Sequence, residues 1–380
     1  MKANILAAGL ILVGCALATE VSAQVTSSRD GRSVIYKGPA NAAEPDYANA
    51  QPLLLPKPAF KPAVGPLNHH APLHEKSGVM PGGRGDGKES PENIPAQKHS
   101  AVRNNLGVTP EDAGPTCGIV CQFPFTTNRA DPYFTTTTKY YPFRAAGKLF
   151  FNIGSSAYLC SASLIGQGLV VTAAHCVANY GQSQFYSNWV FVPAYSNGNA
   201  PYGKWKAASA SILTAYYNGT DNCTQYGVIC PDDVALIVLQ PNNTGGYPGA
   251  HTGWFGWGYG GYGFYNGATE ITQLGYPCNL DSCALMQRTD SYGFTDSSYS
   301  NNTIIGSEQE GGSSGGPWMV NFGQPPNGLQ ASDLGRNVVV GVTSWGFTDT
   351  TVMEQGAAPF TSGNIAFLWG FVGCPGPAYC

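Results

Sequence analysis

The chain has 380 residues, of which 43% are hydrophobic and 11% are charged, and its formal net charge is −4. This length allows one large or two modest domains. The slightly negative balance offers no basic surface to nucleic acid, so we expect no nucleic-acid partner. Beyond the N-terminal residues, no apolar run approaches the roughly 20 residues that a transmembrane helix needs.

Residues 1–23 have the pattern of an export signal. Lys2 is followed by an apolar run from Ile5 to Ala18, and small residues end the segment at Ala23. This pattern predicts cleavage by signal peptidase and a secreted protein, either extracellular or periplasmic. As an alternative, the residues up to Cys15 resemble a bacterial lipobox, in which Cys15 would carry a lipid that anchors the protein to the cell envelope.

Residues 24–115 are rich in Pro, Gly, Ala, Asn and Lys and hold few aromatic residues, whereas every tryptophan lies at position 189 or beyond. Such a segment buries little apolar surface, so we expect a disordered, Pro-rich pro-region or linker. Within it lie His69, His70 and His74 and the tripeptide Arg84-Gly85-Asp86. We expect these residues to be solvated, with neither a metal site nor an adhesion function.

Residues 116–380 are predicted to form the folded domain. From about Tyr140, short apolar or aromatic runs alternate with Gly, Asn, Ser and Pro, which is typical of strands joined by turns. The expected strands are Lys148 to Ile153, Ala162 to Ile165, Leu169 to Thr172, Trp189 to Pro193, Ala210 to Leu213, Val234 to Leu239, Ile271 to Leu274, and Val338 to Ser344. Short helices are expected at Ala173 to Ala178 and Ile365 to Val372. This pattern predicts an all-β sandwich or pair of barrels.

Eleven cysteines are present, and removal of Cys15 with the signal leaves ten. An even number in an exported chain predicts disulfides, although counting alone does not determine their pairing. Proximity in the sequence suggests Cys117 with Cys121, Cys223 with Cys230, Cys278 with Cys283, and Cys374 with Cys380. None of these pairs has the spacing of a zinc site with matching histidines, so we expect no metal.

Two motifs far apart in the chain carry the groups of a nucleophilic site. Thr172-Ala173-Ala174-His175-Cys176 supplies an imidazole, and Gly312-Ser313-Ser314-Gly315-Gly316-Pro317 supplies a serine hydroxyl. A serine hydroxyl is a poor nucleophile at neutral pH and needs a base that accepts its proton. Asp233, followed by an apolar run, lies between the motifs and completes the order His, Asp, Ser. That order is the one of chymotrypsin-like enzymes rather than of subtilisins or α/β-hydrolases.

Residues of about 140 to 373 resemble the chymotrypsin/trypsin-like serine protease family, in particular its secreted bacterial members. The resemblance rests on Cys160-Ser161-Ala162-Ser163-Leu164-Ile165 and on Leu169 to Cys176, which place the two cysteines sixteen residues apart. It implies two six-stranded antiparallel β-barrels, a disulfide between Cys160 and Cys176, and His175 as the general base. It implies no cofactor.

The resemblance also favours roles for the other motif residues. Asp233, rather than the neighbouring Asp232, would fix the tautomer of His175, because it directly precedes a Val-Ala-Leu strand. Ser314, the serine followed by Gly-Gly-Pro, would be the nucleophile. The backbone amides of Gly312 and Ser314 would form the oxyanion hole that stabilises the tetrahedral intermediate.

Substrate-binding residues are predicted by the same resemblance. Ser344, Trp345 and Gly346 resemble the pocket-wall strand, whose backbone pairs with an extended substrate, and Ser344 is a candidate donor to Asp233. Glu308, six residues before the nucleophile, is where trypsin-like members hold the acid that receives Arg or Lys. As an alternative, Glu308 lies on a solvated loop.

Two departures from the family pattern limit these expectations. Ser313 stands where members activated by a newly cut N-terminus carry an aspartate, so that mode of activation is not expected. Thr343 replaces the histidine that glutamate-specific relatives place before the pocket-wall serine, which argues against that specificity.

Together these patterns predict a secreted serine endopeptidase that acts on protein or peptide substrates through an acyl-enzyme intermediate, with Arg or Lys before the scissile bond. One alternative is a catalytically inactive protease fold that serves as a binding module. Another is a surface-attached interaction protein whose functional part is the Pro-rich segment.

Overall fold

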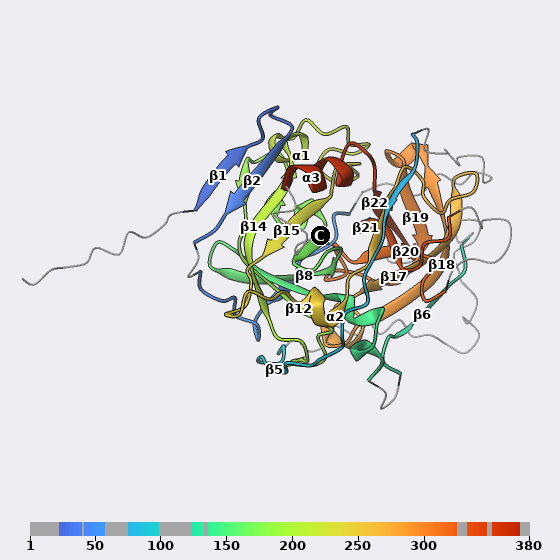
Figure 1. Ribbon diagram of the computed structural model, residues 1–380. Coiled ribbons are helices and arrows are strands. Elements are labelled where there is room, and N and C mark those ends of the chain that lie inside the picture. The colour runs from blue at the N-terminus through green and yellow to red at the C-terminus, as the bar shows by residue number, and fades with distance from the viewer. Residues whose placement is uncertain are drawn as a thin grey trace, which may run out of the picture.

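The computed structural model describes residues 23–39, 42–57, 75–98, 123–132, 136–324, 333–347 and 352–372. They form two closed antiparallel β-barrels, which lie side by side in Figure 1 with β8, β12, β14 and β15 at the left and β17 to β22 at the right. Six strands close each barrel, so the predicted all-β fold of two six-stranded antiparallel barrels is confirmed.

The first barrel closes in the order β7-β8-β9-β15-β14-β12, with β12 pairing back to β7. Its strands are β7 (Ala146–Ile153), β8 (Ser156–Leu164), β9 (Leu169–Thr172), β12 (Ser187–Pro193), β14 (Trp205–Leu213) and β15 (Ala235–Leu239). A small hairpin, β10 (Ala178–Asn179) with β11 (Gln184–Phe185), follows β9.

The second barrel closes in the order β17-β18-β19-β22-β21-β20, with β20 pairing back to β17. Its strands are β17 (Ala268–Gly275), β18 (Gln287–Asp296), β19 (Asn302–Gly306), β20 (Pro317–Val320), β21 (Val338–Gly346) and β22 (Glu354–Pro359). Two further strands add to its edges, β16 (Gly256–Tyr259) beside β21 and β6 (Phe125–Arg129) beside β18.

Helices are few and short. The α-helices are α1 (Thr214–Asn218), α2 (Gly249–Thr252) and α3 (Ile365–Val372), and the 3₁₀ turns are η2 (Thr137–Lys139), η3 (Phe143–Ala145), η4 (Ala174–Cys176), η5 (Asp281–Cys283) and η6 (Ser297–Tyr299). The helices predicted after His175 and at the C-terminal end are present as η4 and α3. Within the described ranges, no helix has the length and apolar character that crossing a membrane requires.

All the predicted strands are present, because each has an apolar run that the barrels bury. The sequence pattern missed several others, including β18 and β22, whose residues are mainly polar or small. Every residue of β22 is nevertheless buried. Backbone pairing to β19 and β21 on either side holds this strand in place, and such pairing needs no apolar side chain.

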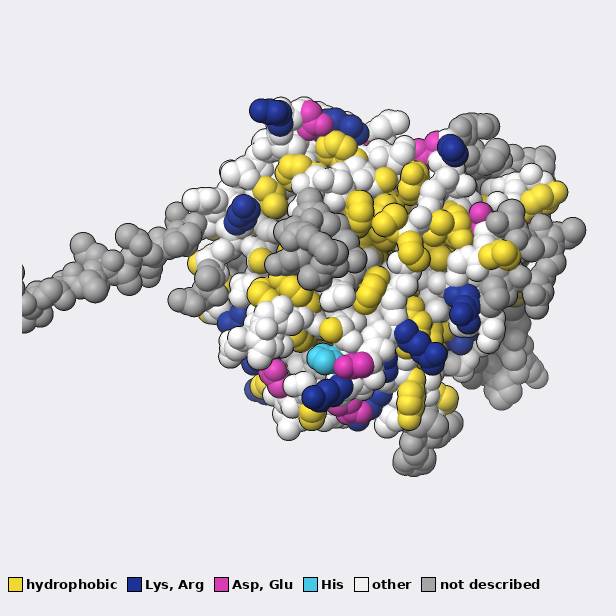
Figure 2. Space-filling view, in the orientation of Figure 1, with side chains coloured by type: hydrophobic (Ala, Val, Ile, Leu, Met, Phe, Trp, Pro, Cys, Tyr) yellow, Lys and Arg dark blue, Asp and Glu magenta, His cyan; other side chains and the backbone are white. Residues whose placement is uncertain are grey.

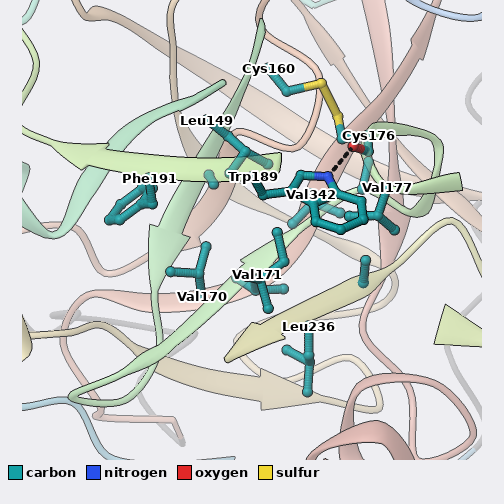
Figure 3. Packing of buried hydrophobic residues seen from close by; sticks show 14 of the residues in the cluster. Leu149, Cys160, Val170, Val171, Cys176, Val177, Trp189, Phe191, Leu236 and Val342 are labelled. Carbon is teal, nitrogen blue, oxygen red and sulfur yellow. Dashed lines mark hydrogen bonds between the residues drawn. A yellow bond between two sulfur atoms is a disulfide. The ribbon is translucent and has the colours of Figure 1, made fainter. Parts of the chain in front are cut away.

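The core of the first barrel lies directly behind the histidine motif. Val170, Val171 and Leu236 fill the barrel, and the Cys160–Cys176 disulfide lies at one end of the same cluster (Figure 3). Trp189 donates its Nε1–H to the carbonyl oxygen of Cys176 at 3.1 Å. This packing fixes the turn that carries the imidazole, because the turn is tied to the core by both a covalent bond and a buried hydrogen bond.

The N-terminal part differs from the expectation of disorder. Its described residues form β1 (Gln24–Ser27), β2 (Ser33–Lys37), β3 (Gln51–Pro52), β4 (Gly78–Met80) and β5 (Glu92–Asn93). β2 pairs with β14, β3 with β8, β4 with β16, and β5 with β13 (Asn199–Ala200). Residues 75–98, light blue in Figure 1, therefore contact both barrels.

A composition poor in apolar residues did not prevent this order. Strand addition to an existing sheet edge uses backbone N–H and C=O groups, which every composition supplies. A few apolar side chains then anchor the added segments, and the buried ones include Val34, Tyr47, Ala50, Leu55 and Ile94. The segments are ordered by the barrels rather than by a core of their own.

Lys148 is the buried charged residue that ties residues 75–98 to the first barrel. It lies on β7 with no solvent exposure, and burial lowers the pKa of its amine well below the usual value. Its Nζ donates to the side-chain oxygen of Gln97 and to the carbonyl oxygen of Cys283, and lies 4.1 Å from the ring centre of Tyr195. Gln97 therefore satisfies an amine that has no access to water.

Candidate functional site

His175 and Asp233 form a hydrogen-bonded pair at neighbouring strand ends. Asp233 lies just before β15 and His175 just after β9, and these strands pair with Ala235 opposite Thr172. The Nδ1 of His175 lies 2.8 Å from Oδ2 of Asp233. The backbone N–H of His175 also donates to Oδ1 of Asp233 at 2.8 Å. Both oxygens of the carboxylate thus bind the same residue, which fixes the orientation of the ring.

Ser344 donates a further hydrogen bond to the same carboxylate. Its hydroxyl lies 2.6 Å from Oδ2 of Asp233, and the structure buries both side chains. The structure therefore brings Ser344 of β21 and His175 of the first barrel together on one acid. This contact crosses between the barrels, so the carboxylate lies at their junction.

The Gly-Ser motif that contains Ser314 lies in the loop before β20 and is held by Ser161 of β8. The N–H of Ser161 donates to the carbonyl oxygen of Ser314 at 2.7 Å, and its hydroxyl donates to that of Gly312 at 2.8 Å. The sequence analysis did not assign Ser161 a role, although it belongs to the motif that begins at Cys160. Its position next to Cys160 is the one sequence feature that sets it apart, and that position alone does not indicate a contact with the loop around Ser314.

Gly315 allows this loop to lie against the strand that leads to the histidine. Its φ is +75°, and a Cβ at this position would lie 1.9 Å from Oγ1 of Thr172. Any other residue would therefore force the loop away. This close contact places Ser314 next to Thr172, the last residue of β9. Thr172 precedes His175 by three residues in the sequence.

The hydroxyl of Ser314 is fully buried, and His175 is 7% exposed. Within the described part of the chain, neither Oγ of Ser314 nor Nε2 of His175 has a hydrogen-bond partner. Two buried side-chain atoms without partners in one region are unusual, since buried polar atoms are normally paired.

Glu308 is half-buried near this loop. Asn279 donates its side-chain N–H to the carbonyl oxygen of Glu308 at 2.7 Å and accepts the N–H of Glu310 at 3.1 Å, which fixes the backbone here. Burial raises the pKa of the Glu308 carboxyl. No cation in the described residues pairs with it.

A network of buried amides lies beneath the same loop and was missed by the sequence analysis. The side-chain N–H of Gln355 donates to the carbonyl oxygen of Gln309, and Gln273 donates to Oε1 of Gln355 at 2.6 Å and to Oγ1 of Thr343 at 2.9 Å. These side chains come from β17, β21, β22 and the loop before Ser314. Isolated glutamines carry no sequence signal for such a network, since only the fold brings them together.

Asp232, the rival of Asp233, faces a different partner. Its backbone N–H donates to Oδ2 of Asp221 at 3.1 Å. Burial raises the pKa of Asp221 to about 7, with repulsion from Asp232 as a second cause, and burial raises the pKa of Asp232 to about 6. The structure thus assigns Asp233 to the histidine and Asp232 to a separate acidic pair.

This acidic pair predicts a loss of stability as the pH rises. The folded state retains protons that the unfolded chain releases near pH 4, so the free energy of unfolding falls between about pH 4 and 7. Asp221→Asn should flatten this decline, which thermal unfolding at several pH values measures. As a control, Asp46→Asn should leave the slope in this window unchanged, since Asp46 is exposed and a hydrogen bond from Asn49 lowers its pKa. Equal slopes for Asp221→Asn and the natural chain would contradict the assignment.

His251, the other histidine considered for the base, lies outside the site. It belongs to α2, and its Nδ1 lies 2.8 Å from Oδ1 of Asp86. Figure 2 shows a histidine beside an acidic side chain on the surface around α2. Asp86 is therefore paired within the molecule, although the sequence placed it in a disordered segment.

Three disulfides occur in the described residues, namely Cys160–Cys176, Cys223–Cys230 and Cys278–Cys283. The predicted pairs of Cys117 with Cys121 and Cys374 with Cys380 lie outside the described residues, as do Cys15, the signal segment up to residue 22 and the three histidines from 69 to 74.

Two clusters have metal-like spacing in the described part of the chain, but both depend on disulfide sulfurs, which are not thiolate ligands.

The barrels define the class of chymotrypsin-like serine proteases, and comparison with known families agrees. A family model described as Trypsin matches residues 135–362, more than half of the chain, and the chain therefore belongs to the trypsin family.

Two curated proteins are similar to part of the chain. Glutamyl endopeptidase of Bacillus licheniformis is 29% identical over 143 residues, which cover 37% of this chain and 39% of that protein. The extracellular metalloprotease of Bacillus subtilis (strain 168) is 26% identical over 151 residues, which cover 38% and 42%. The chain spans about two fifths of the length of these relatives.

Solved structures similar to the chain include the thermostable serine protease AL20 from an extremophilic microorganism, with 24% identity, a TM-score of 0.49 and coverage of 60% of this chain and 98% of that chain. Protease Anisep from Arthrobacter nicotinovorans has 26% identity, a TM-score of 0.46 and coverage of 57% and 90%.

Proposed function

We propose that the chain is a serine endopeptidase in which Ser314, His175 and Asp233 are the catalytic residues. The observation that carries this proposal is the carboxylate of Asp233, which binds Nδ1 of His175 at 2.8 Å and leaves Nε2 free. A carboxylate on Nδ1 holds the neutral tautomer in which Nε2 can accept a proton. Trypsin-family membership supports the same reaction class.

In the proposed reaction, the hydroxyl of Ser314 attacks the scissile carbonyl while His175 takes its proton. The amides of Gly312 and Ser314 donate to the oxygen that becomes negative, and each such donor lowers the barrier by about 3 kcal/mol. The imidazole then gives its proton to the leaving amine. Water attacks the resulting ester by the same route and releases the acid product.

The test of this function is covalent labelling. The full chain, incubated for many hours with a fluorophosphonate, should carry one adduct, and mass spectrometry should place it on Ser314. A chain that stays unlabelled and cleaves no unfolded protein would instead be the non-catalytic binding module, and the proposal would be rejected.

We further propose that the enzyme prefers Arg or Lys before the scissile bond, with Glu308 as the acid that receives the cation. Desolvation is the cause of the raised pKa of Glu308, and no cation in the described residues offsets it. A substrate guanidinium or ammonium would supply the missing countercharge. The similarity to a glutamyl endopeptidase suggests the opposite preference, but a second carboxylate beside Glu308 would be repelled.

Glu308→Gln should lower kcat/KM for peptides with Arg or Lys before the scissile bond by about 10- to 100-fold. It removes a charge-assisted hydrogen bond, whose contribution of about 1.5 to 3 kcal/mol corresponds to a rate change of that size. Glu310→Gln, two residues away, is the matched control and should leave the preference unchanged. Because burial raises the pKa of Glu308, the preference should fade with decreasing pH before the usual carboxyl pKa is reached. A peptide library that shows no change in Glu308→Gln would refute this assignment.

The predicted export signal, the three disulfides and the extracellular relative support a secreted protein, and we propose this location. Anchoring through a lipid on Cys15 is the alternative, and N-terminal sequencing of the exported protein distinguishes the two. Cleavage before Gln24 supports secretion, whereas a lipidated N-terminal Cys15 overturns it.

A further inference from the structure

Residues 51–56 lie across the groups that would bind a substrate. β3 (Gln51–Pro52) pairs with Tyr158 and Leu159 of β8, directly before the disulfide cysteine that pins the histidine turn. The N–H of Leu53 then donates to the carbonyl oxygen of Leu159 at 3.0 Å. The segment thus begins beside the strand that leads to the Cys160–Cys176 bridge.

The middle of this segment occupies an amide that the proposed mechanism assigns to the oxyanion. The N–H of Gly312 donates to the carbonyl oxygen of Leu53 at 3.1 Å. The neighbouring Gly311 also lies against the carbonyl oxygen of Leu53, since a Cβ on Gly311 would lie 3.2 Å from that oxygen. A substrate carbonyl cannot take this position while Leu53 holds it.

The end of the segment occupies the pocket-wall strand. The N–H of Gly346 donates to the carbonyl oxygen of Pro56 at 3.2 Å. Leu55 is only 4% exposed, and its Cδ1 would lie 3.3 Å from a Cβ on Gly346. Leu54, in contrast, is 71% exposed, although its Cδ2 would lie 3.3 Å from a Cβ on Gly311. The segment therefore buries Leu55 against the strand at Gly346 and leaves most of the preceding Leu54 exposed to solvent.

From these contacts we infer that residues 51–56 are an autoinhibitory segment that fills the catalytic cleft in the direction opposite to a substrate. This inference rests on the proposed protease function. In this arrangement Ser314 and His175 are both buried, and Oγ and Nε2 have no partner in the described part of the chain.

From the chain direction we expect the segment to block the site without being cut. We place the acyl side of a substrate along the strand at Gly346, the expected pocket wall, and the leaving amine towards His175, whose turn is tied by a disulfide to Cys160 next to Leu159. A substrate therefore runs from Gly346 to Leu159, whereas this segment reaches Leu159 with Leu53 and Gly346 with Pro56. The nitrogen bonded to the Leu53 carbonyl leads away from the imidazole, so His175 cannot protonate it as a leaving group.

A matched pair of full-chain variants tests the inference. Leu55→Glu places a charge in the buried position and should release the segment, since an unpaired buried charge is strongly disfavoured. Leu54→Glu places the same charge on the exposed neighbour and should leave the segment bound. Thermal unfolding of the variants reports whether both retain the fold.

The first measurement is the rate at which Ser314 reacts with a fluorophosphonate. We expect Leu55→Glu to react at least about tenfold faster than the natural chain, and Leu54→Glu to react like the natural chain. Equal rates in all three chains would overturn the inference and leave the protease function standing.

The second measurement is hydrogen exchange in the same chains carrying Ser314→Ala, which needs no catalysis. The amides of Leu53, Gly312 and Gly346 should be protected and should lose protection with Leu55→Glu but not with Leu54→Glu. Unprotected amides in the parent chain would overturn the inference. If protection follows this pattern but no chain is ever labelled, the protease function fails while occupancy of the cleft by residues 51–56 is upheld.

Discussion

Ser314→Ala should lower kcat for peptide hydrolysis by about 10⁶-fold, because it removes the atom that forms the acyl-enzyme. The residual rate would come from substrate binding and the oxyanion donors alone. The comparison is best made both in the natural chain and in chains carrying Leu55→Glu, so that release of residues 51–56 does not limit the rate. Steady-state hydrolysis of a Lys-containing peptide measures it.

Ser313→Ala is the matched control for this experiment. Ser313 is the adjacent serine in the same motif, and its hydroxyl donates to the carbonyl oxygen of Glu310 at 2.7 Å rather than facing the imidazole. Its loss removes this hydrogen bond and a longer one that the hydroxyl accepts from Gln355 at 3.4 Å. Each contributes about 1 kcal/mol to stability, so activity should be retained within roughly tenfold. Loss of activity in Ser313→Ala with survival in Ser314→Ala would reverse the assignment of the nucleophile.

Asp233→Asn should lower kcat by about 10⁴-fold while the protein remains folded. The carboxylate accepts from Nδ1 and the backbone N–H of His175 and from the hydroxyl of Ser344. An amide offers only one acceptor oxygen, so its NH₂ would face a donor or force the ring into the wrong tautomer. The loss of kcat should become smaller at high pH if hydroxide takes the proton that His175 no longer accepts. A pH profile of kcat for Asp233→Asn measures this.

Asp232→Asn is the control for Asp233→Asn. It tests whether the removal of any carboxylate near the site lowers kcat by the same factor. Asp232 belongs to the pair with Asp221, whose carboxyls have pKa values raised to about 6 and about 7. Its substitution should leave kcat within a few-fold and should not weaken the protein at neutral pH. A 10⁴-fold loss in Asp232→Asn, with Asp233→Asn active, would assign the catalytic acid to Asp232 instead.

The strands of both barrels could be predicted wherever an apolar run fills the core, as at Leu169 to Thr172 and Val338 to Ser344. Polar strands such as β18 were not predicted, because their position depends on backbone pairing with strands that are distant in the sequence. The same limit applies to β1–β5. Composition predicts whether a segment can form its own core, but not whether an existing sheet edge will pair with it.

Within the site, the histidine and the acid were predictable because short motifs place each of them at a strand end. The choice of Asp233 over Asp232 and the contact from Ser344 agree with the geometry. Ser161 and the buried glutamines were not predicted, since their roles come from contacts between elements. The occupation of the cleft by residues 51–56 could not be predicted either, because it uses backbone atoms that every sequence shares.

The amine of Lys148 sets a boundary for proteolytic trimming of the N-terminal part. It lies in an aromatic cage, and Gln97 supplies one of its two hydrogen-bond acceptors. An enzyme shortened beyond this glutamine would have to hydrate the amine or leave it unsatisfied inside the barrel, at a cost of about 1 to 3 kcal/mol or more. A durable mature form should therefore begin before residue 97, so that trimming can free the cleft only if it stops short of this residue.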